Sequence, residues 1–468
     1  MTKKISSSGV DMTKVSNNKV NKINARNVAL EIITSIFEDK AYTNIAIDKY
    51  FKNHDDISKI DRAFITRIVE GTVEHVITID YIINKFSKTK TNKMKKIILH
   101  ILRLSVYQIK YMDKVPVSAV CNEAVKLAKK RKFNSLSGFV NGVLRNIARN
   151  IDSIQYPDEK DEPVKYLSIV YSFPMWIVEL WLEHYDYETV KNMCINSNKT
   201  VKTNIRCNLT KTNPEELKKQ LQDSNVNVEE GKLLDYALKI SNYNSIRGLK
   251  AFNQGKFTVQ DESSMLVAQL ANPKEDSLVV DVCAAPGGKT THFAEKMNNT
   301  GRVISRDIYP KKLQLIDENV KRLQLNNVDI KEYNALEIDS LMIEKADIVI
   351  ADIPCSGLGI IRKKPDIKYN VERKDIDDLI DIQRNILKVV CKYVKTGGIL
   401  MYSTCTVNPE ENIKNVKWFT DNFPFELVDF EDNLPNTINN NKKGYIQLLP
   451  GFYDTDGFFI AKLRRIGN

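Results

Sequence analysis

Two cysteines stand where a thiol could take part in a reaction. Cys355 follows the apolar run ADIVIAD, with the carboxylate of Asp352 three positions before it, and Cys405 directly follows the apolar run GGILMYST. Both runs are typical of buried strands, and parallel sheets bind ligands at the carboxyl ends of their strands. A thiolate is a nucleophile when its surroundings activate it. The pattern therefore raises the hypothesis of covalent catalysis, with different tasks for the two thiols.

A glycine-rich turn lies upstream, in VVDVCAAPGGKTTHFAEKM, where Gly287 and Gly288 let a ligand approach the backbone beside a helix N-terminus. The P-loop pattern fails because Cys283 occupies its first glycine position, and G-x-G-x-x-G is absent too. The next predicted strand ends in Asp307, whose carboxylate suits a ribose diol. A nucleoside cofactor without a polyphosphate, such as S-adenosylmethionine, fits these features. A purely structural turn is the alternative.

The elements around these motifs change character along the chain. From Phe257, strand-like segments alternate with helical ones, which predicts a parallel, doubly wound α/β sheet. Before it, apolar residues recur at helical spacing without a strand pattern, which predicts a helical bundle. We expect a multidomain protein with a disordered lead (1–22), a helical RNA-binding domain (23–150), a linker (151–166), a small α+β module (167–255) and an α/β domain (256–468).

The composition favours a polyanionic partner. The 468 residues carry a net charge of +11, which is typical of nucleic-acid binding; a solvated basic surface is the alternative. Seven cysteines without C-x-x-C spacing argue against a disulfide framework and a zinc site. No segment of the sequence is typical of a signal peptide or a membrane span. We expect a cytoplasmic monomer without a metal.

The motifs together resemble those of a known family. DVCAAPGGKTTH, ADIPCSGLGIIRKKPDIKY and YSTCTVNPEEN are similar to the cofactor and two-cysteine motifs of the NOL1/NOP2/Sun RNA cytosine-C5 methyltransferases, and LLPGFYDTDGFFIAKLRR resembles their closing hairpin. VNGVLRN, YSFPMWIVELW and FTVQDESSMLVA resemble the branch that methylates small-subunit (16S) rRNA and carries a NusB-like RNA-binding domain. The resemblance implies a NusB-like bundle, a class I Rossmann-like methyltransferase domain, S-adenosylmethionine as cofactor and 16S rRNA as substrate.

The resemblance also assigns a cofactor site. The family's loop falls on seven consecutive residues: Cys283, Ala284, Ala285, Pro286, Gly287, Gly288 and Lys289. The ribose-binding acid falls on Asp307. The adenine-side residue, usually Asp, is Asn334 here, and its carbonyl oxygen can still accept a hydrogen bond from an adenine amino group. Asp352 matches the acid before the Pro-Cys pair and is expected to line the cofactor site as well.

The resemblance gives the two thiols separate tasks. Cytosine C5 is too weak a nucleophile to take a methyl group directly, and a thiolate added to C6 activates it. In this family the Thr-Cys thiol adds to C6, so Cys405 is the expected nucleophile and Cys355 is expected to assist release. DNA cytosine-C5 methyltransferases attack with a Pro-Cys thiol, so chemistry alone leaves the order open. We expect Asp352 to contact N3 and the exocyclic amine, and Lys289 to place the base or lower a thiol pKa.

Two neighbouring segments have simpler predicted tasks. VNPEENI predicts a helix capped by Asn408 with Glu411 completing a capping box, so Glu411 is interpreted as support for the turn of the second cysteine. IIRKKPDIK is interpreted as an RNA contact through Arg362, Lys363 and Lys364. A solvated basic loop is the alternative.

Two rival functions remain open. A methyltransferase of tRNA, another RNA or DNA would need the same site chemistry, and only the NusB-like domain points away from it. A non-catalytic NusB-like RNA-binding factor with a relic enzyme domain is the other rival, and the intact cysteines, carboxylate and glycine loop argue against it.

Overall fold

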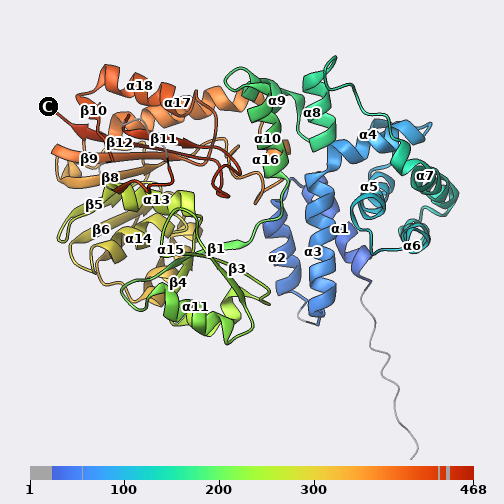
Figure 1. Cartoon of the computed structure of the whole chain (residues 1–468), viewed down its shortest axis with the longest axis horizontal. Coiled ribbons are helices and arrows are strands. Elements are labelled where there is room, and N and C mark those ends of the chain that lie inside the picture. Colours follow the sequence, from blue (N-terminus) through green and yellow to red (C-terminus); the bar gives the residue numbers. More distant parts are fainter. Residues whose placement is uncertain (1–23, 55, 431–432, 439–442, 468) are drawn as a thin grey trace, which may run out of the picture.

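The computed structural model describes residues 24–54, 56–430, 433–438 and 443–467. The disordered lead predicted for residues 1–22 lies outside them. Figure 1 shows a helical part beside a part built on two sheets, with α8 to α10 at the junction. Within the described ranges, no helix is long and apolar enough to cross a membrane.

The N-terminal part is a bundle of seven helices: α1 (Ala25–Glu38), α2 (Thr43–Lys52), α3 (Lys59–Glu74), α4 (Val76–Phe86), α5 (Lys96–Tyr111), α6 (Val117–Lys130) and α7 (Ser137–Asn150). Helix α1 begins where the Asn24 side chain accepts a hydrogen bond from the amide of Asn27. Its apolar stripe, which includes Ile32, Ile33 and Ile36, is buried against α3 and α5. The predicted helical bundle is confirmed.

Three helices connect the bundle to the sheets: α8 (Pro163–Tyr171), α9 (Met175–Leu182) and α10 (Tyr187–Ser197). Helix α8 begins inside the segment predicted as a linker, with Pro163 in its first turn. Trp181 of α9 is fully buried in one apolar cluster with Ile361 and Val407, which follow the two strands that carry the cysteines. The connecting helices therefore pack directly on the cysteine-bearing loops.

The small module has a four-stranded antiparallel sheet of order β2-β3-β1-β4. Its elements are β1 (Thr203–Cys207), α11 (Pro214–Gln222), β2 (Asn227–Glu230), β3 (Ala237–Ser241), α12 (Lys250–Asn253) and β4 (Phe257–Val259). Because β4 pairs with β1, this sheet continues past the boundary predicted at residue 256.

The large sheet has the order β10-β12-β9-β8-β5-β6-β7, with β11 paired to β12. Its strands are β5 (Leu278–Asp281), β6 (Arg302–Asp307), β7 (Val328–Glu332), β8 (Ala346–Asp352), β9 (Val394–Thr404), β10 (Phe425–Leu427), β11 (Tyr445–Leu448) and β12 (Phe458–Arg465). Strands β5 to β9 pair in parallel, as predicted. The C-terminal hairpin adds β12 antiparallel to β9, so the sheet as a whole is mixed.

Helices cover both faces of this sheet (Figure 1). They are α13 (Glu262–Ala271), α14 (Gly288–Lys296), α15 (Pro310–Leu323), α17 (Arg373–Val390) and α18 (Ile413–Asn422). The short helix α16 (Ile367–Asn370) lies instead at the junction, where it packs with α9 and α10. Successive strand residues point to opposite faces: Val279 packs in the cluster that includes α13 to α15, and Val280 packs in the cluster that includes α17 and α18. The doubly wound arrangement is confirmed.

A buried lysine joins the helical bundle to the α/β part. Lys368 of α16 donates to the backbone carbonyls of Glu74 and Ser172, both at 2.9 Å, and to the Asn198 side chain at 3.4 Å. Burial lowers the pKa of this ammonium group. The adjacent Tyr369 packs against the core of the bundle. The bundle is therefore anchored to the segment that follows the Pro-Cys pair.

Candidate active site

The structure brings the two predicted cysteines together. Strands β8 and β9 are parallel neighbours with Asp352 opposite Ser403, so their carboxyl ends meet at one edge. The sulfur atoms of Cys355 and Cys405 lie 3.4 Å apart as free thiols. Gly359 closes the loop between them, because its amide donates to the carbonyl of Cys405 at 3.0 Å.

The surroundings of the Cys355 thiol disfavour its thiolate. The hydrogen bond with Cys405, burial and the negative charge of Glu411 raise the pKa of the Cys355 thiol well above its usual range. A raised pKa keeps Cys355 protonated at neutral pH. A protonated thiol is a poor nucleophile, so this environment is unsuited to attack by Cys355 while Cys405 lies beside it.

A carboxylate and a lysine complete the same edge. Lys289 Nζ lies 2.5 Å from Asp352 Oδ2, and the Ser403 hydroxyl donates to Asp352 Oδ1 at 2.8 Å. The Lys289 ammonium also lies 5.2 Å from the centre of the Phe458 ring. Both carboxylate oxygens are thus held, which fixes the acid between the glycine loop and the strand that precedes Cys405.

The predicted cofactor loop runs from the end of β5 to the first turn of α14. Gly287 has a φ of 97°, and a Cβ there would lie 3.2 Å from Ile316, so the turn requires glycine. The Asp307 carboxylate at the end of β6 accepts from the amides of Ala285 at 3.3 Å and Tyr309 at 3.1 Å. The loop and the predicted ribose acid are therefore in direct contact.

Asn334 follows β7, the next strand of the same sheet. Its Oδ1 accepts from the amide of Leu336 at 3.1 Å, and its Nδ2 donates to Glu337 at 3.2 Å. The side chain thus shapes its own turn. Because β5, β6 and β7 are parallel neighbours, the glycine loop, Asp307 and Asn334 share one edge of the sheet.

Sequence reasoning missed Asp281, the last residue of β5. It is buried and accepts from the Thr290 hydroxyl at 2.7 Å. Burial, followed by the charge of Asp352, raises its pKa to about 7. The signal was present in the sequence, since an acid interrupts the apolar run VVDVC.

Arg206 of β1 was missed as well. Its guanidinium is fully buried, pairs with Glu295 of α14 at 2.8 Å and donates to the carbonyl of Gly288 at 3.0 Å. It also bonds Gln260 and Thr291. An arginine of the small module therefore supports the helix that begins at the glycine loop, and no local pattern could have indicated a partner 89 positions away.

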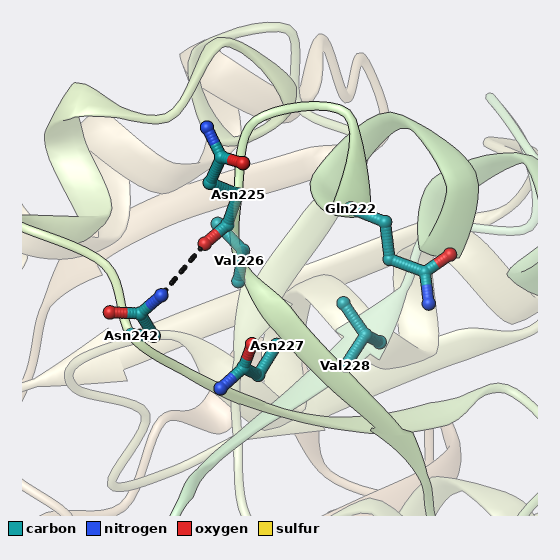
Figure 2. Close-up of a pocket in the computed structure, with 6 residues that line it drawn as sticks. All are labelled: Gln222, Asn225, Val226, Asn227, Val228 and Asn242. Atoms are coloured by element: carbon teal, nitrogen blue, oxygen red, sulfur yellow. Dashed lines mark hydrogen bonds between the residues drawn. The ribbon is translucent and has the colours of Figure 1, made fainter.

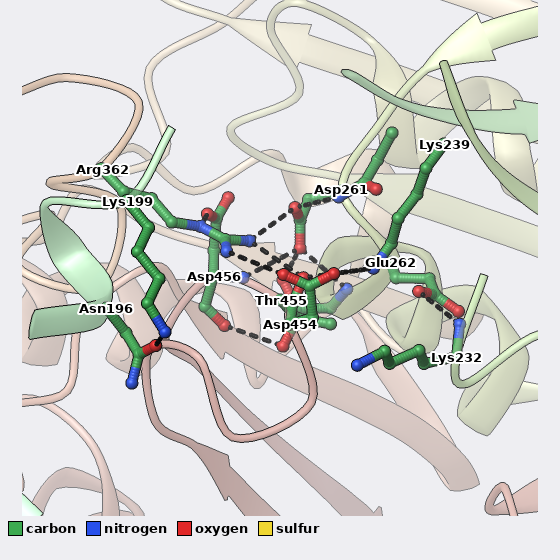
Figure 3. A network of polar contacts seen from close by, with 12 residues as sticks. Asn196, Lys199, Lys232, Lys239, Asp261, Glu262, Arg362, Asp454, Thr455 and Asp456 are labelled. Atoms are coloured by element: carbon green, nitrogen blue, oxygen red, sulfur yellow. Dashed lines mark hydrogen bonds and ion pairs between the residues drawn. The ribbon is translucent and has the colours of Figure 1, made fainter. Parts of the chain in front are cut away.

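The interpretation of Arg362 as an RNA contact is wrong, whereas for Lys363, which is exposed, it stays a prediction. Arg362, with only 3% of its side chain exposed, donates to Asp456 at 2.6 Å, and Lys363 bonds Asp261 at 2.5 Å and Asp456 at 2.7 Å. Figure 3 shows how this network joins Arg362 to the C-terminal hairpin and to the small module. The alternative of a solvated loop fails for Arg362 too, whereas Lys364 is exposed.

The predicted capping box is also wrong, because α18 begins at Ile413 rather than after Asn408. The Glu411 carboxylate is instead buried and bonded to the amide of Ser356 at 2.8 Å and its hydroxyl at 2.6 Å. The acid supports the loop of Cys355 as well as the turn after Cys405.

A pocket in the small module contains no predicted site residue. A polar hollow of about 460 Å³ lies beside the edge strand β2 (Figure 2). Its lining is Gln222, Asn225, Val226, Asn227, Val228 and Asn242. In the part of the chain that the structure describes, no three His, Cys, Asp or Glu side chains are grouped to hold a metal ion.

Family models match three parts of the chain. The model described as 16S rRNA methyltransferase RsmB/F matches residues 268–464, and the NusB family model matches residues 23–149. A ferredoxin-like domain of RsmF/B-like methyltransferases matches residues 173–247.

Whole-chain relatives agree with these matches. The chain is 37% identical to the probable ribosomal RNA small subunit methyltransferase B of Bacillus subtilis and 34% identical to that of Synechocystis, over 95% of this chain and 100% of each relative. The crystal structure of PH0851 is 27% identical with a TM-score of 0.79, covering 94% of this chain and 99% of that one. NSun6 from Pyrococcus horikoshii with SFG, at 24% identity and a TM-score of 0.58, covers 64% of this chain and 100% of its own and shares the fold. The chain therefore belongs to the RsmB/F family of 16S rRNA methyltransferases.

Proposed function

We propose that this protein transfers a methyl group from S-adenosylmethionine to C5 of a cytosine in 16S rRNA, in the cytoplasm. The observation that carries the proposal is the pair of free thiols 3.4 Å apart at the ends of neighbouring strands. The Asp352 carboxylate, which is paired with Lys289, lies at the same edge. The glycine turn at Gly287 lies there too. The chain matches two relatives over their full length, and both are named as small-subunit rRNA methyltransferases. This similarity supports the choice of substrate.

The cofactor proposal rests on the edge formed by β5, β6 and β7. Gly288, the first residue of α14, is partly exposed, so a ligand can approach its backbone from solvent. Each oxygen of Asp307 accepts one backbone hydrogen bond, which leaves acceptor capacity for two ribose hydroxyls. Asn334 is assigned to the adenine side. The bound cofactor supplies an electrophilic methyl group on its sulfonium.

The proposed reaction divides the work among four side chains. The Cys405 thiolate adds to C6 of the cytosine, which makes C5 electron-rich enough to take the methyl group. Asp352, held by Lys289, contacts N3 and the exocyclic amine during this attack. The C5 proton is then lost to solvent and its C–H electron pair forms the C5–C6 double bond. The bond between C6 and sulfur breaks, and its electron pair returns to the Cys405 sulfur. Cys355 is assigned to assist this release.

Methyl transfer from labelled S-adenosylmethionine to purified 16S rRNA tests the proposal. Bisulfite sequencing of rRNA from cells with and without the gene should show one cytosine that loses its protection when the gene is absent. Labelling of tRNA in place of 16S rRNA would contradict the substrate, and no labelling of any RNA by the folded protein would contradict the activity.

A further inference from the structure

The carboxylate of Glu411 lies at the centre of a buried polar cluster. Its Oε1 accepts from the amide of Ser356 at 2.8 Å and from the side chain of Gln383 at 3.1 Å. Its Oε2 accepts from the hydroxyl of Ser356 at 2.6 Å, from the side chain of Asn408 at 3.1 Å and from the hydroxyl of Thr406 at 3.5 Å. These five donors are all neutral.

This cluster fixes the backbone on both sides of Cys355. Ser356, the next residue, gives two hydrogen bonds to Glu411. Pro354, the preceding residue, has its carbonyl bonded to Gln383 at 3.0 Å, and Gln383 is itself bonded to Glu411. The Ser356 hydroxyl also lies 2.7 Å from that of Thr406, the residue after Cys405. One acid thus joins the loops of both thiols.

The negative charge lies on the Cys355 side of the thiol pair. The carboxylate accepts two short hydrogen bonds from Ser356, the residue next to Cys355, at 2.8 and 2.6 Å, whereas Thr406, the residue next to Cys405, donates to it at 3.5 Å. A like charge disfavours a second negative charge close to it. The charge of Glu411 indeed contributes to the raised pKa of Cys355.

We propose that Glu411 is a positioning residue that holds the Pro-Cys loop against the Thr-Cys strand and directs the reactive thiolate to Cys405 rather than Cys355. The proposal rests on the roles of the two thiols in the proposed function. Titratable and charged groups from each neighbouring element also face this cluster. They are Tyr402 on β9, Cys405 directly after β9 and Arg384 on α17.

The charge effect can be measured without RNA or cofactor. In the Cys405→Ala protein, the rate at which iodoacetamide alkylates Cys355 is followed against pH by peptide mass spectrometry. Glu411→Gln should move the midpoint of this profile down by about one pH unit or more, because it removes a like charge of the kind that shifts a pKa by this amount. An unchanged midpoint would overturn the proposal.

Glu410→Gln is the matched control. Glu410 is the sequence neighbour of Glu411, but it is partly exposed and pairs with Lys414 at the surface. The same change of charge there should leave the midpoint for Cys355 unaltered. An equal shift in both variants would mean that net charge, rather than this contact, sets the profile, and it would also overturn the proposal.

Turnover separates positioning from a general structural role. Glu411→Gln with both cysteines intact should lower kcat about tenfold to a hundredfold while KM for S-adenosylmethionine stays within about twofold, since small displacements of a reacting group have costs of this size.

Glu411→Asp keeps the charge but shortens the reach to Ser356 and Gln383. It should keep the high alkylation midpoint and still lose kcat. If Glu411→Gln does not fold, Glu411→Asp decides, because an unchanged kcat would overturn the proposal. Absence of methyl transfer by the unaltered protein would instead contradict the proposed function and leave the alkylation result intact.

Discussion

At the scale of single residues, the thiols of Cys355 and Cys405 lead to opposite expectations for their alanine variants. Addition to C6 needs the nucleophile, whereas elimination must also remove the C5 proton. Cys405→Ala should therefore abolish methylation and give no covalent RNA complex. Cys355→Ala should attack, methylate and remain attached, which would appear as a nuclease-sensitive, slowly migrating band on a denaturing gel.

The double variant, with both cysteines replaced by alanine, is the control for this pair. It should give no band, because without the Cys405 thiol no covalent bond to RNA forms. Complexes with Cys405→Ala and none with Cys355→Ala would mean that the roles are reversed and that the Pro-Cys thiol attacks.

Asp281 gives a prediction about stability and pH. Its pKa is about 7 in the folded protein because of burial, above its usual value of 3.8. The folded state therefore binds the extra proton between about pH 4 and pH 7, and the free energy of unfolding falls as pH rises through this range. Asp281→Asn should abolish this decrease in the free energy of unfolding. Urea unfolding at pH 5 and pH 8 should show a smaller difference in the variant.

Asp378→Asn on the exposed side of α17 serves as the comparison for that measurement. It should keep the pH dependence of the unaltered protein. If Asp281→Asn keeps it as well, Asp281 does not titrate in this range.

At the scale of elements, the contact between β1 and α14 makes the small module part of the cofactor region. Arg206→Met would leave Glu295 as an unpaired charge in a buried site. Breaking such a pair costs about 3–5 kcal/mol, so the free energy of unfolding by urea should fall by this amount. Arg247→Met removes an exposed pair with Glu318 and should cost about 0–1 kcal/mol. Similar decreases in both variants would contradict the role of the buried contact.

The elements also separate what the sequence could predict from what it could not. Strands β5 to β9 and the helices between them were predictable because each has its own apolar period, and parallel pairing then brings Cys355 and Cys405 to one edge. The partners of Arg362 and Arg206 lie 54 to 101 positions away, on other elements. A local sequence pattern cannot indicate such distant partners. For this reason Arg362 was interpreted as an RNA contact and Arg206 was overlooked.

The start of α18 shows the same limit at shorter range. VNPEENI has the residues of a capped helix start, but the Glu411 side chain bonds Ser356, Gln383 and Asn408 instead. The tertiary contacts outweigh the local preference, and the helix begins two residues beyond Glu411, at Ile413.

At the scale of the whole molecule, the helical bundle offers exposed cations at the ends of α6 and α7, at the far side from α17 and α18 (Figure 1). Lys130→Glu together with Arg145→Glu should weaken RNA binding and reduce its salt dependence, by about 0.7–0.9 in the logarithmic slope for each phosphate that the protein no longer neutralises. Affinity for S-adenosylmethionine should not change. Filter binding at several salt concentrations, with calorimetry for the cofactor, measures both.

Lys388→Glu with Lys417→Glu is the matched control, because both residues are exposed on α17 and α18 and the net charge changes equally. Equal weakening by both pairs would show that overall charge, rather than this face of the bundle, captures RNA. These substitutions are a sharper test than removal of the bundle, because its removal would expose Lys368 and Tyr369.

The anchoring of Lys368 also sets an order of events during synthesis. The carbonyl of Glu74 leaves the ribosome 294 residues before the lysine that binds it. The bundle has its own core and packs on α8 through Thr78 and Ile169, so these parts can fold early. Its orientation relative to the large sheet cannot become fixed until residue 368 emerges. In a nascent chain stalled before that point, the bundle should be folded while its orientation relative to the later part of the chain is not yet fixed.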